Sequence, residues 1–177
     1  RYPATPHSAL KRCLTEQSIF DGSVTRRTQH THYVLCVDTS GSMRTPCSWT
    51  NLRTGAREDT QRIEVVKSVL DYFKQKRLSY ACQETEHGDL YTTIIFHSCA
   101  SRVQPPEGDR RVGVHINEAA SFSLPNETGA TAFDPPLLKA ADSFTNTPAG
   151  LRQSLIFLTD GRGSYTQQAV QKLCNSL

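Results

Sequence analysis

The sequence predicts an α/β fold with a doubly wound, mostly parallel sheet that carries helices on both faces. Largely apolar runs at residues 33–37, 90–96 and 155–158 have the length and continuity of strands that are covered on both sides. The segments between them repeat apolar residues at intervals of three and four, which is typical of helices packed on a sheet. Strands that alternate with helices favour parallel pairing.

The first strand is the run at 33–37, which ends in Asp38. A polar stretch with Pro46 and Gly55 follows and leads to a predicted helix at residues 59–77. Asp59 or Thr60 is its expected N-terminal cap, since both side chains accept hydrogen bonds from open backbone N–H groups. The apolar positions of this helix are Ile63, Val66, Val69, Leu70 and Phe73.

The second half of the chain continues the alternation of strands and helices. A strand at 90–96 is followed by one at 100–103, and so short a connection requires the two to be antiparallel neighbours. A helix then begins near Pro135 and Pro136, which are tolerated in a first turn. The strand at 155–158 ends in Thr-Asp-Gly at 159–161, and a short helix closes the chain.

The length of 177 residues, with 37% hydrophobic and 21% charged residues, fits one globular domain and leaves no room for a second. We assign residues 1–31 to a polar N-terminal extension and 32–177 to the domain. Since a complete doubly wound domain continues with further strands and helices, we expect this one to be truncated at its C-terminal end.

Charge and hydropathy exclude several classes of function. The net charge of +3 comes from 20 basic and 17 acidic residues, and the basic pairs are scattered along the chain, which argues against nucleic-acid binding. No apolar run approaches the roughly 18 residues of a membrane span, so we expect no membrane segment in this chain.

Cysteine usage bears on the cellular compartment. The six cysteines are widely spaced and form no C-x-x-C pair, which argues against a zinc site or a redox dithiol. Scattered thiols favour a reducing compartment, and we expect a cytoplasmic or nuclear protein rather than a secreted one. The even count leaves the disulfide state open.

Oxygen-bearing side chains gather where the predicted strands end. The D-x-S-x-S spacing turns Asp38, Ser40 and Ser42 toward one point, and Thr131 and Asp160 lie at turns at the same edge of the sheet. These five residues offer oxygen ligands without histidine or cysteine, which favours Mg²⁺, Mn²⁺ or Ca²⁺ over zinc. The alternative is that the aspartates only cap turns and the serines only bond local backbone.

The segment Val-Asp-Thr-Ser-Gly-Ser-Met at 37–43 resembles the metal-ion-dependent adhesion site (MIDAS) of von Willebrand factor type A (VWA) domains. The turn Gly-Ala-Thr at 129–131 is similar to the family's Gly-Gly-Thr, and Thr-Asp-Gly at 159–161 to its strand-ending motif. The resemblance covers about residues 31–177. It implies a Rossmann-like fold in which Asp38, Ser40, Ser42, Thr131 and Asp160 hold Mg²⁺, directly or through water.

In that family the open position of the ion takes an acidic side chain of a partner protein, so the resemblance implies a non-enzymatic binding module. If the aspartates act through water, the ion stays underneutralised and attracts a carboxylate strongly; if they bind directly, the attraction weakens. The loop at 43–59 follows the motif, and we expect it to set specificity through Trp49 and Arg44, although a disordered insertion is an equal alternative.

Two other functions compete with the binding module. A Mg²⁺-dependent phosphotransferase or hydrolase would use Asp38 as its nucleophile, but it would normally place a second acid or base where this chain has Ser40. A metal-free scaffold within a larger assembly is the third interpretation. The partner's identity and the parent protein do not follow from the sequence.

Overall fold

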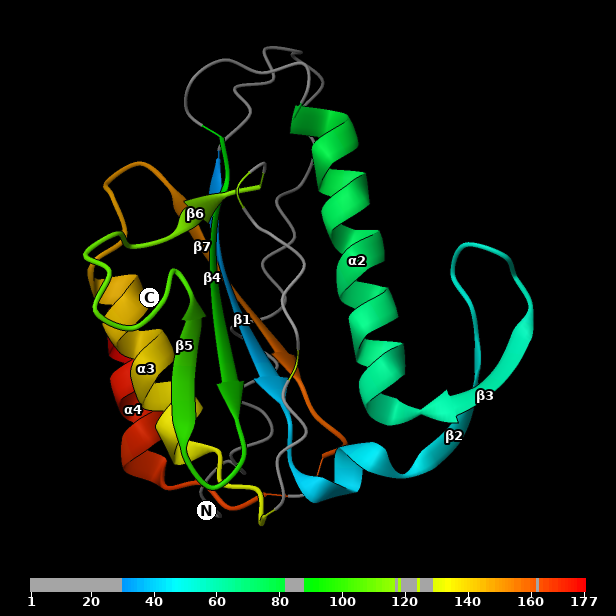
Figure 1. Ribbon diagram of the computed structural model, residues 1–177. Coiled ribbons are helices and arrows are strands. Elements are labelled where there is room, and N and C mark those ends of the chain that lie inside the picture. Colours follow the sequence, from blue (N-terminus) through cyan, green and yellow to red (C-terminus); the bar gives the residue numbers. More distant parts are fainter. Residues whose placement is uncertain (1–29, 82–87, 117, 119–123, 125–128, 162) are drawn as a thin grey trace, which may run out of the picture.

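The computed structural model describes residues 30–81, 88–116, 118, 124, 129–161 and 163–177. Nearly all of the predicted N-terminal extension, residues 1–29, lies outside them. Within the described residues a five-stranded sheet has helices packed on both of its faces (Figure 1). The predicted α/β class is therefore confirmed.

Strand β1 (Thr31–Asp38) pairs in parallel with β4 (Leu90–Phe96) on one side and with β7 (Arg152–Leu158) on the other. The strands β5 (Ala100–Gln104) and β6 (Val114–His115) pair antiparallel with β4, as predicted for the first of them. The order β5-β4-β1-β7 confirms a mostly parallel sheet, and the first apolar run of the sequence, β1, is one of its two inner strands.

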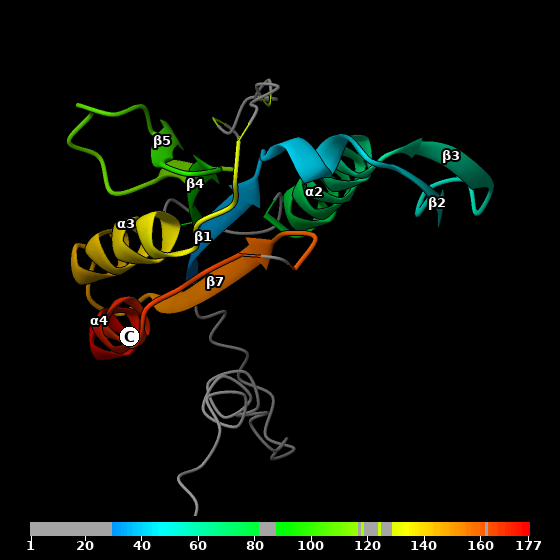
Figure 2. The same cartoon turned by 90° about the horizontal axis from the view of Figure 1, so that it is seen from below.

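Helix α2 (Arg62–Ala81) covers one face of the sheet, and α3 (Asp134–Thr145) with α4 (Gln167–Ser176) covers the other (Figure 2). Alternate residues of β1 point to opposite faces because successive side chains of a strand alternate. Val34 and Cys36 pack in the core under α3 and α4, whereas Leu35 and Val37 pack in the core under α2. All four are fully buried.

The predicted helix start at Asp59 is wrong. Residues 46–61 form a hairpin of β2 (Pro46–Thr50) and β3 (Arg57–Gln61), and α2 begins directly after it. Asp59 is therefore no helix cap; it accepts a hydrogen bond from the Ser48 hydroxyl across the hairpin. Gly55, at φ 71°, allows the turn, and cross-strand pairing outweighs the local helical pattern of residues 59–61.

The connections from β1 place a reversal of the strand order at one edge of the sheet. The chain passes from β1 through α2 to β4 on one side, and later through α3 to β7 on the other side. The strand order thus reverses at β1, and in open α/β sheets ligands bind beyond the strand ends at such a point. The carboxyl ends of β1, β4 and β7 meet at the lower edge of the molecule in Figure 1. None of the described helices is long and apolar enough to cross a membrane.

Candidate metal site at the carboxyl edge of the sheet

Asp38 is a buried carboxylate at the end of β1, with no exposed surface. One of its oxygens, Oδ1, accepts the Ser40 N–H at 2.8 Å, and Oδ2 accepts the Thr159 hydroxyl at 2.8 Å. Among the residues that the structure describes, no basic side chain forms an ion pair with Asp38. A buried charge without a counter-charge is costly, so this position favours a cation.

The two serines of the motif lie side by side above this carboxylate. Ser40 has an extended backbone (φ −60°, ψ 164°) and precedes the 3₁₀ helix at Gly41–Arg44, which carries Ser42. The Oγ atoms of Ser40 and Ser42 are 3.1 Å apart. Ser40 is buried, whereas Ser42 is exposed. The buried Met43 anchors the loop in the core under α2, so the hydroxyl pair is held on a fixed support.

Asp160 follows β7, and its side chain is only 7% exposed. Its Oδ2 accepts a hydrogen bond from Arg62 Nη1 at 2.8 Å. Its Oδ1 is buried and has no hydrogen-bond partner among the described residues. The Thr159 hydroxyl ties this loop to Asp38. A buried carboxylate oxygen without a donor carries a desolvation penalty that a metal ion or water would remove.

The turn with Thr131 borders the same loop. A Cβ atom on Gly41 would lie 3.9 Å from the backbone nitrogen of Gly129, which places the two loops in contact. The N–H of Ala132 donates to the carbonyl of His97 at 2.8 Å and fixes the turn to the β4–β5 connection. Thr131 lies between these anchors and is partly buried, and its hydroxyl makes no hydrogen bond within the described part of the chain.

The structure thus brings together the segments that carry all five predicted ligands. The described residues contain no cluster of three or more His, Cys, Asp and Glu side chains, so a metal here must also use hydroxyl oxygens. Two carboxylates with three hydroxyls are a donor set for a hard cation such as Mg²⁺. The buried Asp38 and the unpartnered Oδ1 of Asp160 are the two features of this set that a cation would stabilise.

The two predicted partner-binding residues lie in different surroundings. Arg44 closes the 3₁₀ helix directly after the motif and is partly buried. Trp49 lies in β2 opposite Glu58. Together with Ser68 and Asp71 of α2 it lines a cavity of about 160 Å³. Arg44 is therefore next to the site along the chain, while Trp49 faces the helix that flanks the hairpin.

Sequence reasoning missed two residues that shape the site. Thr159 belongs to the recognised Thr-Asp-Gly segment, but its hydrogen bond to Asp38 was not foreseen. Arg62 lies 98 positions from Asp160, and nothing in the local pattern connects the two. The sequence offered one signal for Arg62: it directly precedes Ile63, the first apolar position of the predicted helix. That helix begins at the same edge of the sheet as the D-x-S-x-S motif.

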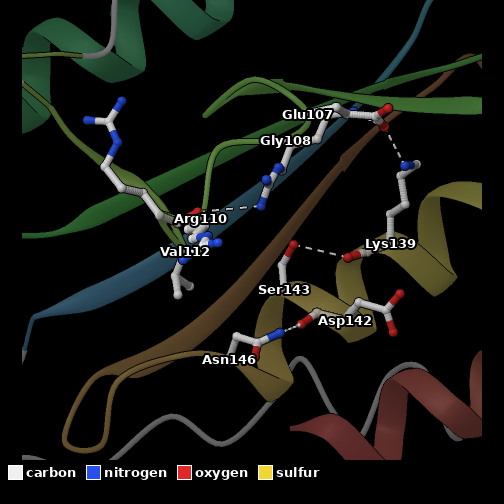
Figure 3. Close-up of a pocket in the computed structure, with 10 residues that line it drawn as sticks. Glu107, Gly108, Arg110, Val112, Lys139, Asp142, Ser143 and Asn146 are labelled. Carbon is white, nitrogen blue, oxygen red and sulfur yellow. Dashed lines mark hydrogen bonds and ion pairs between the residues drawn. The ribbon is translucent and has the colours of Figure 1, made fainter.

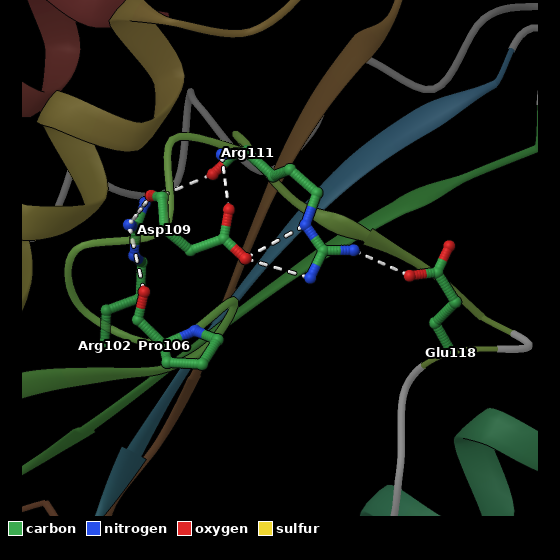
Figure 4. A network of polar contacts seen from close by, with 5 residues as sticks. All are labelled: Arg102, Pro106, Asp109, Arg111 and Glu118. Carbon is green, nitrogen blue, oxygen red and sulfur yellow. Dashed lines mark hydrogen bonds and ion pairs between the residues drawn. The ribbon is translucent and has the colours of Figure 1, made fainter.

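A second cavity of about 530 Å³ lies between α3 and the loop at 105–112 (Figure 3). Its cationic side chains are largely engaged within the protein. The Arg102 guanidinium donates to the carbonyl oxygens of Pro106 and Asp109, and Arg111 pairs with Asp109 and Glu118 (Figure 4). These contacts hold the loop on the edge of the sheet.

No protein-family model matches the chain, and no curated protein matches it. Among solved structures it is similar to an aerotolerance-related membrane protein from Bacteroides fragilis NCTC 9343 with multiple mutations to serines (20% identity, TM-score 0.49, 82% of this chain and 63% of that chain). It is also similar to the conserved hypothetical protein BatB from Bacteroides thetaiotaomicron (19% identity, TM-score 0.46, 82% of this chain and 62% of that chain). A third similar structure is an uncharacterized membrane spanning protein from Vibrio fischeri (23% identity, TM-score 0.41, 66% of this chain and 52% of that chain). The chain spans less than two thirds of each of these structures, and the similarity concerns the backbone alone.

Proposed function

We propose that this chain is a VWA-type, metal-dependent protein–protein interaction module. In this proposal Asp38, Ser40, Ser42, Thr131 and Asp160 hold Mg²⁺, with Mn²⁺ or Ca²⁺ as substitutes. The ion in turn binds an Asp or Glu side chain of a partner protein. The observation that carries the proposal is a pair of aspartates at one edge of the sheet. Asp38 is buried without a basic partner in the described residues, and Asp160 has a buried oxygen that no described residue hydrogen-bonds.

The charges at the site support binding of a carboxylate. Asp38 and Asp160 contribute two negative charges, and Arg62 contributes one positive charge. A divalent cation changes the local sum from −1 to +1, which attracts one further carboxylate. Each oxygen of Asp38 accepts one hydrogen bond from the protein and keeps a second lone pair for the ion or its waters. Asp160 Oδ1 and the three hydroxyls complete the proposed set of oxygen ligands.

An enzyme that uses Asp38 as its nucleophile is less consistent with the geometry. The carboxylate has no exposed surface, and each of its oxygens is held by a donor 2.8 Å away. A nucleophile must present a lone pair to its substrate along an open path. Incubation with p-nitrophenyl phosphate and Mg²⁺ tests this alternative, and we expect no turnover above that of the Asp38→Asn variant.

The proposal is tested by the binding of a carboxylate to the metal-loaded chain. An acidic peptide with a single Asp is titrated in the presence of Mg²⁺, and again after addition of EDTA. We expect binding only with the metal. At a Mg²⁺ concentration that just saturates the unaltered chain, Asp160→Asn should bind the peptide at least tenfold more weakly, because it loses a charged ligand and no longer retains the ion. Asp142→Asn is the matched control, because Asp142 pairs with Lys172 on the surface of α3 and α4. Equal peptide affinity with and without EDTA would contradict the metal-dependent module and leave the metal-free scaffold as the remaining function.

A further inference from the structure

Arg62 is a fixed cation at the rim of the candidate metal site. It is the first residue of α2, and its Nη1 lies 2.8 Å from Asp160 Oδ2. The side chain of Asp160 is 7% exposed, whereas that of Arg62 is 40% exposed. The guanidinium therefore caps a buried carboxylate from the solvent side and keeps donors facing outward.

The position of Arg62 is set by the motif loop itself. Its backbone N–H donates to the carbonyl of Thr45 at 3.2 Å, directly after the 3₁₀ helix that carries Ser42. The next residue, Ile63, is 2% exposed and packs in the same core cluster as Met43 of that helix. The start of α2 and the D-x-S-x-S loop are thus one packed unit, which holds the backbone of Arg62 beside the site.

Resting on the proposed function, we propose that Arg62 is a positioning residue that weakens metal binding and strengthens binding of the partner's carboxylate. By holding Asp160 Oδ2, it leaves the buried Oδ1 as the oxygen without a partner among the described residues, and ligating carboxylates are usually oriented by such a second hydrogen bond. Its charge also cancels one of the two aspartates. With Mg²⁺ the site then carries +1, whereas a site without Arg62 would be neutral and would attract an acidic side chain less.

A purely structural ion pair is the competing explanation. Removing one partner of such a half-buried pair lowers stability, but a structural role alone changes neither metal nor ligand binding in a defined direction. The charge argument instead predicts two opposite changes in one variant, because lost positive charge favours the cation and disfavours the anion. Measuring both affinities separates the explanations.

The test compares the full chain with Arg62→Gln, which removes the charge, and Arg62→Lys, which keeps it. Arg152→Gln is the matched control, since Arg152 is an exposed arginine at the start of β7, the opposite end of that strand from Asp160, and its removal changes the net charge equally. Mg²⁺ affinity is measured by titration calorimetry, and acetate affinity by titration of the Mg²⁺-saturated proteins. For Arg62→Gln we expect Mg²⁺ to bind about tenfold more tightly and acetate several-fold more weakly. Arg62→Lys and Arg152→Gln should stay near the unaltered chain.

Equal Mg²⁺ and acetate affinities in Arg62→Gln and the unaltered chain would overturn the role of Arg62 while leaving the proposed function intact. If Arg62→Gln bound Mg²⁺ and the unaltered chain did not, the result would support the charge role of Arg62 and overturn the proposed function. Absence of binding in all folded variants, checked by circular dichroism, would overturn both.

Discussion

His32 provides a pH-dependent test of the fold that supports the site. It lies in β1, six residues before Asp38, and has no exposed surface. Its Nε2 is 2.9 Å from Thr92 Oγ1, and its Nδ1 is 2.7 Å from Thr147 Oγ1. The Thr92 hydroxyl donates to the Val112 carbonyl at 2.6 Å, so its oxygen accepts from His32 Nε2–H. The Thr147 hydroxyl lies 3.4 Å from the Ser143 carbonyl but only 2.7 Å from His32 Nδ1, and in the neutral ring it donates to Nδ1.

Burial lowers the pKa of His32 from 6.5 to about 4. Because the folded pKa lies below the unfolded one, the unfolded chain binds a proton first as the pH falls. The stabilisation is fully present above pH 6.5 and is lost as the pH falls toward 4. At 1.4 kcal/mol per pKa unit the whole effect is about 3 kcal/mol, of which about 2 kcal/mol is lost by pH 5.

The assay is urea unfolding at several pH values between 8 and 5. The unaltered chain should lose about 2 kcal/mol more unfolding free energy over this range than His32→Gln, which has no titrating ring at this position. His115→Gln is the matched control, since His115 is exposed, and it should follow the unaltered chain. An equal pH dependence in all three proteins would refute the argument.

Three further predictions concern the site and its surroundings. Thr131→Ala should weaken binding of the acidic peptide with little change in unfolding temperature, because it removes a neutral ligand that makes no hydrogen bond within the described residues; an unchanged peptide affinity would exclude Thr131 from the site. Replacing residues 49–58 by a short Gly-Ser turn should leave Mg²⁺ affinity intact and reduce binding to the natural partner. Unchanged partner binding would show that the hairpin does not contribute to specificity. Burial raises the pKa of the Cys36 thiol, so Cys36 should resist alkylation in the folded protein while the exposed Cys99 reacts, as peptide mass mapping would show.

The sheet was predictable because its signals are local. The run at 33–37 is long and apolar enough to identify a buried strand, and the short connection at 97–99 forces β4 and β5 to be antiparallel. The two prolines at 135–136 marked the start of α3 correctly. The hairpin at 46–61 was missed because its strands alternate between exposed and partly buried residues and carry little apolar pattern.

The site was predictable to the extent that its residues lie in recognisable segments. Asp38, Ser40 and Ser42 are close in sequence, and the parallel strands bring Asp160 to the same edge of the sheet. The pairing of Arg62 with Asp160 depends on how the start of α2 packs against the loop after β7. That arrangement involves residues 98 positions apart, and single-sequence patterns do not encode it.

The most direct test of the account is the effect of Mg²⁺ on thermal unfolding of the chain and of Asp38→Ala. A ligand that binds only the folded state stabilises it by mass action, by about 2.7 kcal/mol at a hundredfold excess over the dissociation constant. We predict that the melting temperature of the unaltered chain rises with Mg²⁺ or Mn²⁺ concentration and that the rise disappears in Asp38→Ala. A melting temperature of the folded, unaltered chain that is independent of either ion would contradict the account.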